Sequence, residues 1–132
     1  MTLLHHIALG ARDVSAVAAF YRQAFDLTEL TRHLDDRGNL RSIWLDLGGS
    51  ILMIERTEVS PPIVDGIGAG PFLLAFAISV DQRPAMEEQL ANLGSPIEER
   101  TNFTSYARDP EGNRVAISHF PEPSNEDCID AD

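Results

Sequence analysis

Cysteine and long apolar runs are both scarce in this sequence of 132 residues. Cys128 is the single cysteine, which excludes a disulfide framework and a cysteine-based metal site within one chain. This content suits a reducing compartment, so we expect a cytoplasmic protein. No apolar run approaches the roughly 20 residues that a membrane-spanning helix needs, and no basic N-terminal region precedes a long apolar stretch. We therefore expect no membrane partner.

Positive charge is also scarce, because 10 basic residues, all arginine, stand against 21 acidic residues. No stretch clusters enough positive charge to neutralise a row of phosphates, so we expect no nucleic-acid partner. The formal net charge of −11 favours a cationic ligand or simply serves solubility. Hydrophobic residues make up 43% of the chain, which is typical of a folded protein, and the length suits one compact structural domain.

The first part of the chain, residues 1–56, combines one helix signal with several strand signals. Asp13 is placed to cap a helix, because the residues that follow are apolar at helical spacing. These apolar residues are Val14, Val17, Phe20 and Tyr21. The strand-like segments are separated by glycine-containing turn signals and span residues 3–10, 27–34, 40–47 and 50–56.

Residues 71–120 repeat this order of signals. A strand-like segment at 72–79 comes before a helix signal with Asp81 in front of it, Pro84 in its first turn and Gly94 at its end. Further strand-like segments span residues 97–103, 104–109 and 113–120. The repeat predicts an internal duplication of a βαβββ unit.

The duplication predicts an α+β fold with two βαβββ modules in tandem. We expect the modules to form one curved mixed sheet, a cup, with the helices on its outer face. A proline- and glycine-rich crossover at residues 57–70 joins the modules, and an acidic tail follows at residues 121–132.

Side-chain size alternates along the opening strand of each module. In the first, Ile7 and Leu9 share one face, whereas His6, Ala8 and Gly10 share the other. The second alternates in the same way, with the bulky Leu74, Phe76 and Ile78 opposite Leu73, Ala75 and Ala77. The bulky face is expected to pack on the helices, so the small face leaves either a cup for a small molecule or a surface for a partner chain.

Three motifs carry a resemblance to a known family. They are the strand Leu4-His5-His6-Ile7-Ala8-Leu9, the helix after Asp13 with Ala19-Phe20-Tyr21, and the turn Asp109-Pro110-Glu111-Gly112-Asn113. Over about residues 3–120 the chain resembles the vicinal oxygen chelate superfamily, which groups glyoxalases, bleomycin resistance proteins and extradiol dioxygenases.

The resemblance implies a divalent metal held by a His on the first strand and a Glu on the last strand of each module. The first module matches with His6 and Glu55. The second has Leu73 and Ala116 at the matching positions, and neither side chain has a lone pair to offer. By strand parity His119 points to the opposite face and cannot replace Ala116 without a bulge. We therefore expect no bound metal or other cofactor, with His6 and Glu55 as a partial pair.

Six side chains are candidates for contact with a small-molecule ligand: His6, Trp44, Met53, Glu55, Tyr106 and Arg108. Trp44 and Tyr106 can stack on a flat ligand, and Arg108 can pair with a carboxylate or phosphate. Each also has a purely structural interpretation, Trp44 as a core residue and Arg108 as a surface partner of acidic neighbours.

The leading hypothesis is metal-free ligand binding or sequestration, of the bleomycin-resistance kind. The alternative is a divalent-metal-dependent lyase, isomerase or dioxygenase that acts on a small oxygenated substrate. A third hypothesis keeps catalysis without metal and uses Glu55 as general base. Whether the protein is an enzyme stays open. Exposed sheet edges and the resemblance together predict a homodimer.

Overall fold

The computed structural model describes residues 2–59, 63–66 and 73–124. Parts of the predicted crossover and most of the acidic tail, including Cys128, lie outside these residues. The chain divides into two compact units, Met1–Pro62 and Ile63–Asp132, which are described separately below. None of the described helices is long and apolar enough to span a membrane.

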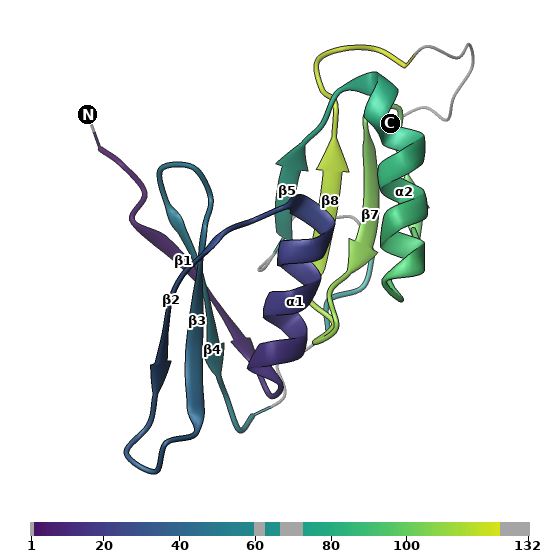
Figure 1. Cartoon of the computed structure of the whole chain (residues 1–132). Helices are drawn as coiled ribbons and strands as arrows, with labels where there is room; N and C mark the ends of the chain where they lie inside the picture. Colours follow the sequence, from purple (N-terminus) through teal and green to yellow (C-terminus); the bar gives the residue numbers. More distant parts are fainter. Residues whose placement is uncertain (1, 60–62, 67–72, 125–132) are drawn as a thin grey trace. The chain divides into compact units, whose positions relative to one another are not determined.

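The first unit has the predicted βαβββ order (Figure 1). Its elements are β1 (His6–Ala11), α1 (Val14–Phe25), β2 (Glu29–Leu34), β3 (Leu40–Asp46) and β4 (Ile51–Arg56). The four strands form one mixed sheet in the order β1-β4-β3-β2, in which β1 runs parallel to β4 and the other pairs are antiparallel. Asp13 caps α1 as predicted, because its Oδ1 atom accepts a hydrogen bond from the backbone N–H of Ala16 at 3.0 Å.

The second unit repeats this topology. Its elements are β5 (Leu73–Ala77), a 3-10 turn (Val80–Gln82), α2 (Arg83–Asn92), β6 (Glu99–Arg100), β7 (Thr104–Arg108) and β8 (Arg114–Ser118). The sheet order β5-β8-β7-β6 matches that of the first unit, with β5 parallel to β8. The α+β fold with two tandem modules is thereby confirmed, and the described residues form two open four-stranded sheets with one α-helix in each unit.

The strand predicted at residues 97–103 is much shorter than expected, since β6 comprises only Glu99 and Arg100. A local turn competes with the strand ladder at this point. The Thr101 hydroxyl accepts hydrogen bonds from the backbone N–H groups of Phe103 and Thr104. The Arg83 guanidinium also donates hydrogen bonds to the carbonyl oxygens of Thr101 and Asn102. These two carbonyl groups are therefore bound to a side chain and not to a neighbouring strand.

The helix α1 covers one face of the first sheet, where it contacts β3 and β4. The core between them is apolar and includes Leu9, Ile43, Leu45, Leu52 and Ile54 from the strands and Val17, Phe20 and Tyr21 from α1. On the other face of β1, His6, Ala8 and Gly10 are exposed. Leu9 is buried and Ile7 is half-buried, so the predicted division of this strand into a bulky face that is more buried and an uncovered small face is confirmed. We call the face of the first sheet opposite α1 the open face.

Candidate functional site

A polar row crosses the open face at one end of the sheet. The strand register places Gly10 beside Glu55, Glu55 beside Ser42 and Ser42 beside His33. Ser42 is only 1% exposed, whereas Glu55 and His33 are half-buried. Neighbouring side chains in such a row lie about 5 Å apart at their Cβ atoms, so a carboxylate, a hydroxyl and an imidazole are lined up across three strands.

An aromatic row lies next to the polar row. Here Ala8 is beside Met53, Met53 is beside Trp44 and Trp44 is beside Thr31. Trp44 and Met53 are half-buried, and Ala8 adds almost no bulk above the sheet. An indole and a thioether next to a small residue make an apolar platform on which a flat ring can lie.

A third row contains His6, Ile51 and Asp46. His6 is exposed, and its Nδ1 atom lies 2.8 Å from Nδ1 of His5. Asp46 accepts a hydrogen bond from the backbone N–H of Gly48 at 2.7 Å. A depression of about 310 Å³ adjoins this end of the sheet and is lined by Leu3, Leu4, His5, Asp46, Gly49, Ser50 and Ile51.

Two ring nitrogens between the polar and aromatic rows lack a partner. The His33 and Trp44 rings pack edge to face with their centroids 5.1 Å apart. His33 Nε2 and Trp44 Nε1 are both buried, and neither has a hydrogen-bond partner in the part of the chain that the structure describes. A buried polar atom without a partner costs about 1–3 kcal/mol, so burial of these two nitrogens opposes folding unless a partner is supplied.

The residues implied as metal ligands do not converge within either unit. In the first unit His6 lies beside Ile51, whereas Glu55 lies beside Gly10. Four residues of parallel strand separate the two donors, which is about 13 Å. Among the described residues, no three His, Cys, Asp or Glu side chains are grouped closely enough to hold a metal ion. Within each unit, the donors of the described residues therefore do not form a metal site.

The positions of the second unit that the resemblance matches to metal ligands carry no donor. Leu73 lies beside Arg114, and the neighbour of Ala116 is Ala75. None of the side chains of Leu73, Ala75 and Ala116 has a group that can bind a metal.

Tyr106 and Arg108, the two candidates from the second unit, lie on β7. Tyr106 is beside Ala116, and Arg108 is beside Arg114. Arg108 is bound within its own unit, because it donates to Glu98 at 3.2 Å and to the carbonyl oxygen of Gly112 at 3.0 Å. Its side chain is 17% exposed, so pairing with a ligand would have to displace these contacts. The other four candidates share the open face of the first unit.

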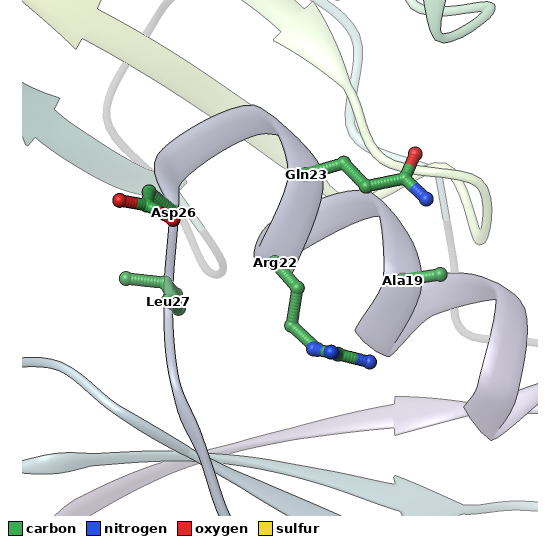
Figure 2. Close-up of a pocket in the computed structure, with 5 residues that line it drawn as sticks. All are labelled: Ala19, Arg22, Gln23, Asp26 and Leu27. Carbon is green, nitrogen blue, oxygen red and sulfur yellow. The ribbon is translucent and has the colours of Figure 1, made fainter.

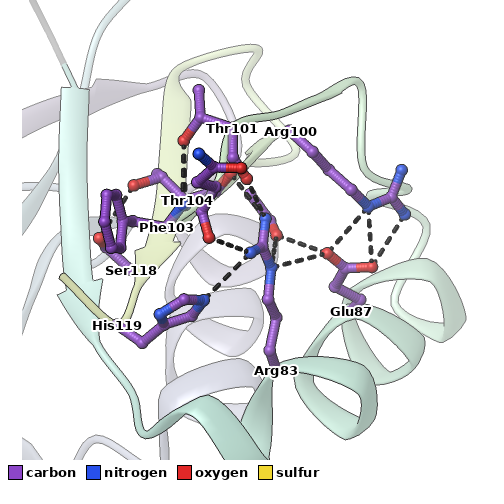
Figure 3. Close-up of polar contacts among 10 residues, drawn as sticks. Arg83, Glu87, Arg100, Thr101, Phe103, Thr104, Ser118 and His119 are labelled. Atoms are coloured by element: carbon purple, nitrogen blue, oxygen red, sulfur yellow. Dashed lines mark hydrogen bonds and ion pairs between the residues drawn. The ribbon is translucent and has the colours of Figure 1, made fainter. Parts of the chain in front are cut away.

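His119 is buried on the α2 side of the second sheet, as parity predicts (Figure 3). Its Nε2 atom lies 3.1 Å from Nη1 of Arg83, and its Nδ1 atom lies 2.7 Å from the carbonyl oxygen of Glu122. Because a guanidinium only donates, Nε2 must accept, and the proton resides on Nδ1. His119 is therefore a structural residue that cannot complete a metal site.

Glu87 lies in the same network, on α2 (Figure 3). Burial raises the pKa of Glu87, but the hydrogen bonds from Arg100 and Ser105 and the charges of Arg100 and Arg83 outweigh burial. The pKa of this carboxyl is consequently held below its ordinary value of 4.5.

A smaller depression of about 190 Å³ lies at the C-terminal end of α1 (Figure 2). It is lined by Ala19, Arg22, Gln23, Asp26 and Leu27. None of the six sequence candidates lies there. The sequence alone missed His33, Ser42 and Thr31 on the open face, although each follows from the alternation of side chains once the register is known.

Comparisons with known proteins agree with the fold. The model of the family described as Glyoxalase/Bleomycin resistance protein/Dioxygenase superfamily matches residues 3–117. No curated protein sequence matches the chain. A mutant of the fosfomycin resistance protein FosX from Listeria monocytogenes, complexed with Mn(II) and 1S,2S-dihydroxypropylphosphonic acid, has a TM-score of 0.74 and 19% identity, covering 89% of this chain and 92% of that one.

Two further solved structures have the same fold. Lactoylglutathione lyase from Agrobacterium tumefaciens has a TM-score of 0.64 and 23% identity, covering 91% of this chain and 95% of that one. A possible glyoxalase from Bacillus cereus has a TM-score of 0.68 and 24% identity, covering 87% and 96%. At these identities the likeness establishes architecture and leaves the chemistry to the residues of this chain.

Proposed function

The chain belongs to the Glyoxalase/Bleomycin resistance protein/Dioxygenase superfamily, and we propose that it binds a small molecule on the open face of its first unit without a resident metal ion. The observation that carries this proposal is the uncovered aromatic row, in which the exposed Ala8 lies beside the half-buried Met53, and Met53 lies beside the half-buried Trp44. A flat ligand that lies on this row would bury the apolar surface of the indole and the thioether. Binding or sequestration needs no further chemistry from the chain.

The donor set supports the metal-free form of the proposal. His6 and Glu55 are about 13 Å apart along the sheet, and the paired positions Ala75 and Ala116 in the second unit carry no donors. The alternative, a divalent-metal-dependent lyase, isomerase or dioxygenase, is favoured by the presence of His6 and Glu55 and by a structural relative whose description names Mn(II).

A metal-free enzyme is the second form of the proposal. Glu55 is half-buried beside Ser42, and it is the carboxylate in the polar row that can accept a proton from a bound substrate. Changing Glu55 to Gln preserves shape and removes the base. Once a ligand that is also turned over has been found, Glu55→Gln should abolish turnover and retain binding, and a variant with full turnover would show that Glu55 is not the base.

The binding test uses the single tryptophan of the chain, Trp44, as an intrinsic reporter. Small flat molecules are screened by quenching of its fluorescence and by thermal shift. Ala8→Phe places a ring over the aromatic row and should abolish binding, whereas Ala16→Phe, at an exposed position on α1, should leave affinity unchanged. Ligands that bind Ala8→Phe as tightly as the parent would place the site elsewhere.

The metal question is settled by a parallel measurement. Elemental analysis of protein purified without a His tag or chelator should find no stoichiometric metal, and titration with Zn, Ni, Mn and Fe(II) should show no tight site. Stoichiometric metal that is lost in both His6→Ala and Glu55→Ala would favour the metalloenzyme.

We also propose a cytoplasmic homodimer. The outer strand β2 leaves one edge of the first sheet unpaired, and Leu30 and Leu34 on this strand are 51% and 59% exposed. Sedimentation equilibrium should give twice the chain mass, and a monomer at micromolar concentration would reject this part of the proposal.

A further inference from the structure

We infer that the contact between Arg83 and His119 makes the second unit sensitive to mild acid: protonation of His119 displaces the Arg83 guanidinium, so that α2 and the loop at residues 101–104 open together. The inference concerns the second unit alone and does not depend on ligand binding by the open face. It follows from how α2 is held on its sheet and from the part that His119 plays in the hydrogen-bond network (Figure 3).

The helix α2 buries much less of its surface than α1 does. Leu90 is the only buried residue of α2. The buried residues of α1 are Val14, Val17, Ala18, Phe20, Tyr21 and Ala24. In α2, Arg83 and Glu87 add polar contacts with groups on β6, on β7 and in the loop between these strands. A segment with few buried apolar contacts opens at low cost once such polar contacts are lost.

The Arg83 guanidinium links α2 to the loop at residues 101–104 (Figure 3). It donates hydrogen bonds to the carbonyl oxygens of Thr101, Asn102 and Thr104. Its Nη1 atom, which binds Asn102, also lies 3.1 Å from Nε2 of His119. Displacement of the guanidinium therefore frees the first turn of α2 and the loop at the same time.

The contact between Arg83 and His119 requires a neutral imidazole. His119 is buried, and its Nδ1 atom donates to the carbonyl oxygen of Glu122 at 2.7 Å, so Nε2 presents its lone pair to Nη1 of Arg83. A proton added at Nε2 removes this lone pair and places a second positive charge 3.1 Å from a donor that is itself charged. Like charges repel strongly at such a distance where water is largely excluded. A protonated His119 is therefore incompatible with the closed position of Arg83.

The charged groups around His119 do not offset this repulsion. Among the described residues, no acidic side chain forms an ion pair with His119. The ring of Phe103 faces it from the loop, and the exposed Glu122 contributes only its backbone carbonyl oxygen. On α2, Glu87 lies 3.5 Å from Nε of Arg83, and its pKa is held below 4.5. Between about pH 8 and 5, His119 is therefore the member of this network whose charge can change.

Amide hydrogen exchange of the full chain, expressed as protection factors, measures this opening. An exposed histidine is half protonated at about pH 6.5, so an opening that brings His119 into water gains a proton below this pH. Because the opened form binds more protons than the closed form, opening is favoured as the pH falls. We expect the protection of amides in α2 and at residues 101–104 to fall about tenfold between about pH 7.5 and 5.5. Amides of α1 should change by less than about twofold.

Three variants assign the effect to this contact. His119→Gln keeps an acceptor for Arg83 and a donor for Glu122 but takes up no proton, so the protection of α2 should no longer depend on pH. Arg83→Gln removes the charge that opposes protonation, so it should also abolish the pH dependence, although it lowers protection at every pH. The matched control is His33→Gln, which removes a half-buried histidine of the first unit and should retain the fall.

Several results would overturn the inference. One is a fall in protection that has the same size in His119→Gln as in the parent, and another is a fall that disappears in His33→Gln. Unchanged protection of α2 in the parent between about pH 7.5 and 5.5 would also overturn it. So would an equal fall in α1, because the acid effect would then not be confined to the second unit. None of these results bears on the open face, which Ala8→Phe tests separately.

Discussion

Replacing Arg83 with Ala should be among the most destabilising single changes in the second unit. The Arg83 side chain is 12% exposed, and its guanidinium forms an ion pair with Glu87 at 3.5 Å and hydrogen bonds with five further groups (Figure 3). Three are the backbone carbonyl oxygens of Thr101, Asn102 and Thr104, at 2.9, 3.1 and 3.0 Å. The others are the Ser105 hydroxyl at 2.9 Å and His119 Nε2 at 3.1 Å.

The expected cost follows from these contacts. A hydrogen bond to a charged group contributes about 1.5–3 kcal/mol, but water will reach part of the vacated space and the five terms are not additive. We therefore expect Arg83→Ala to lower the free energy of unfolding by about 3–5 kcal/mol, the range seen when one member of a buried ionic group is removed. At about 4 °C per kcal/mol, the melting temperature should fall by about 12–20 °C.

Urea denaturation followed by circular dichroism measures this loss. Arg83→Lys keeps the charge but has fewer donors and no planar fork, so it should cost about half as much. Arg37→Ala, at an exposed turn position, should change the free energy of unfolding by less than about 0.5 kcal/mol. A loss below about 1 kcal/mol in Arg83→Ala would refute the view that this side chain holds the loop at residues 101–104.

Three further changes test local features of the fold. Asp13→Ala removes the acceptor for the Ala16 backbone N–H and should cost about 1 kcal/mol in thermal or urea unfolding, with Asp13→Asn nearly neutral. Asp109→Ala removes a carboxylate that is 4% exposed and accepts hydrogen bonds from the backbone and side-chain nitrogens of Asn113. We expect the free energy of unfolding to fall by about 2–3 kcal/mol, and an unchanged value would contradict a structural role for this turn. The pKa of Glu87 is lower in the folded chain than its ordinary value of 4.5, so the ionised carboxylate stabilises the fold fully above about pH 4.5. This stabilisation is lost as the pH falls through the folded-state pKa. The free energy of unfolding, measured from pH 7 to 3, should therefore depend less on pH in Glu87→Gln.

The order of elements and the faces of the opening strand could be predicted from the sequence. Asp13 gave a local capping signal, and the alternation of Ile7 and Leu9 with small residues depends only on strand geometry. Such features depend on a few consecutive residues, and the same order of strand and helix signals occurs in both modules.

The register between strands could not be predicted in this way. Whether Glu55 lies beside His6 or beside Gly10 depends on the register between β1 and β4. Both registers place the same side chains on the same face of each strand, so the alternation of apolar and polar residues does not distinguish them. The partners of Arg108 were also missed, because Glu98 is ten residues away and reaches it across the sheet. The shortened β6 depends on Arg83, which is distant in sequence. Long-range contacts of this kind decide the site, and they become visible only when the strands are placed.

The direct pairing of Ala75 with Ala116 has a consequence for how metal-binding chemistry could be gained or lost in this chain. Neighbouring positions on adjacent strands are about 4.8 Å apart, so Ala75→His with Ala116→Glu would create two donors side by side. In the first unit a single change, Ile51→His, would give His6 an equally close neighbour. Very few substitutions therefore separate the present donor set from a paired one, and chemistry on this fold can change while the backbone stays the same.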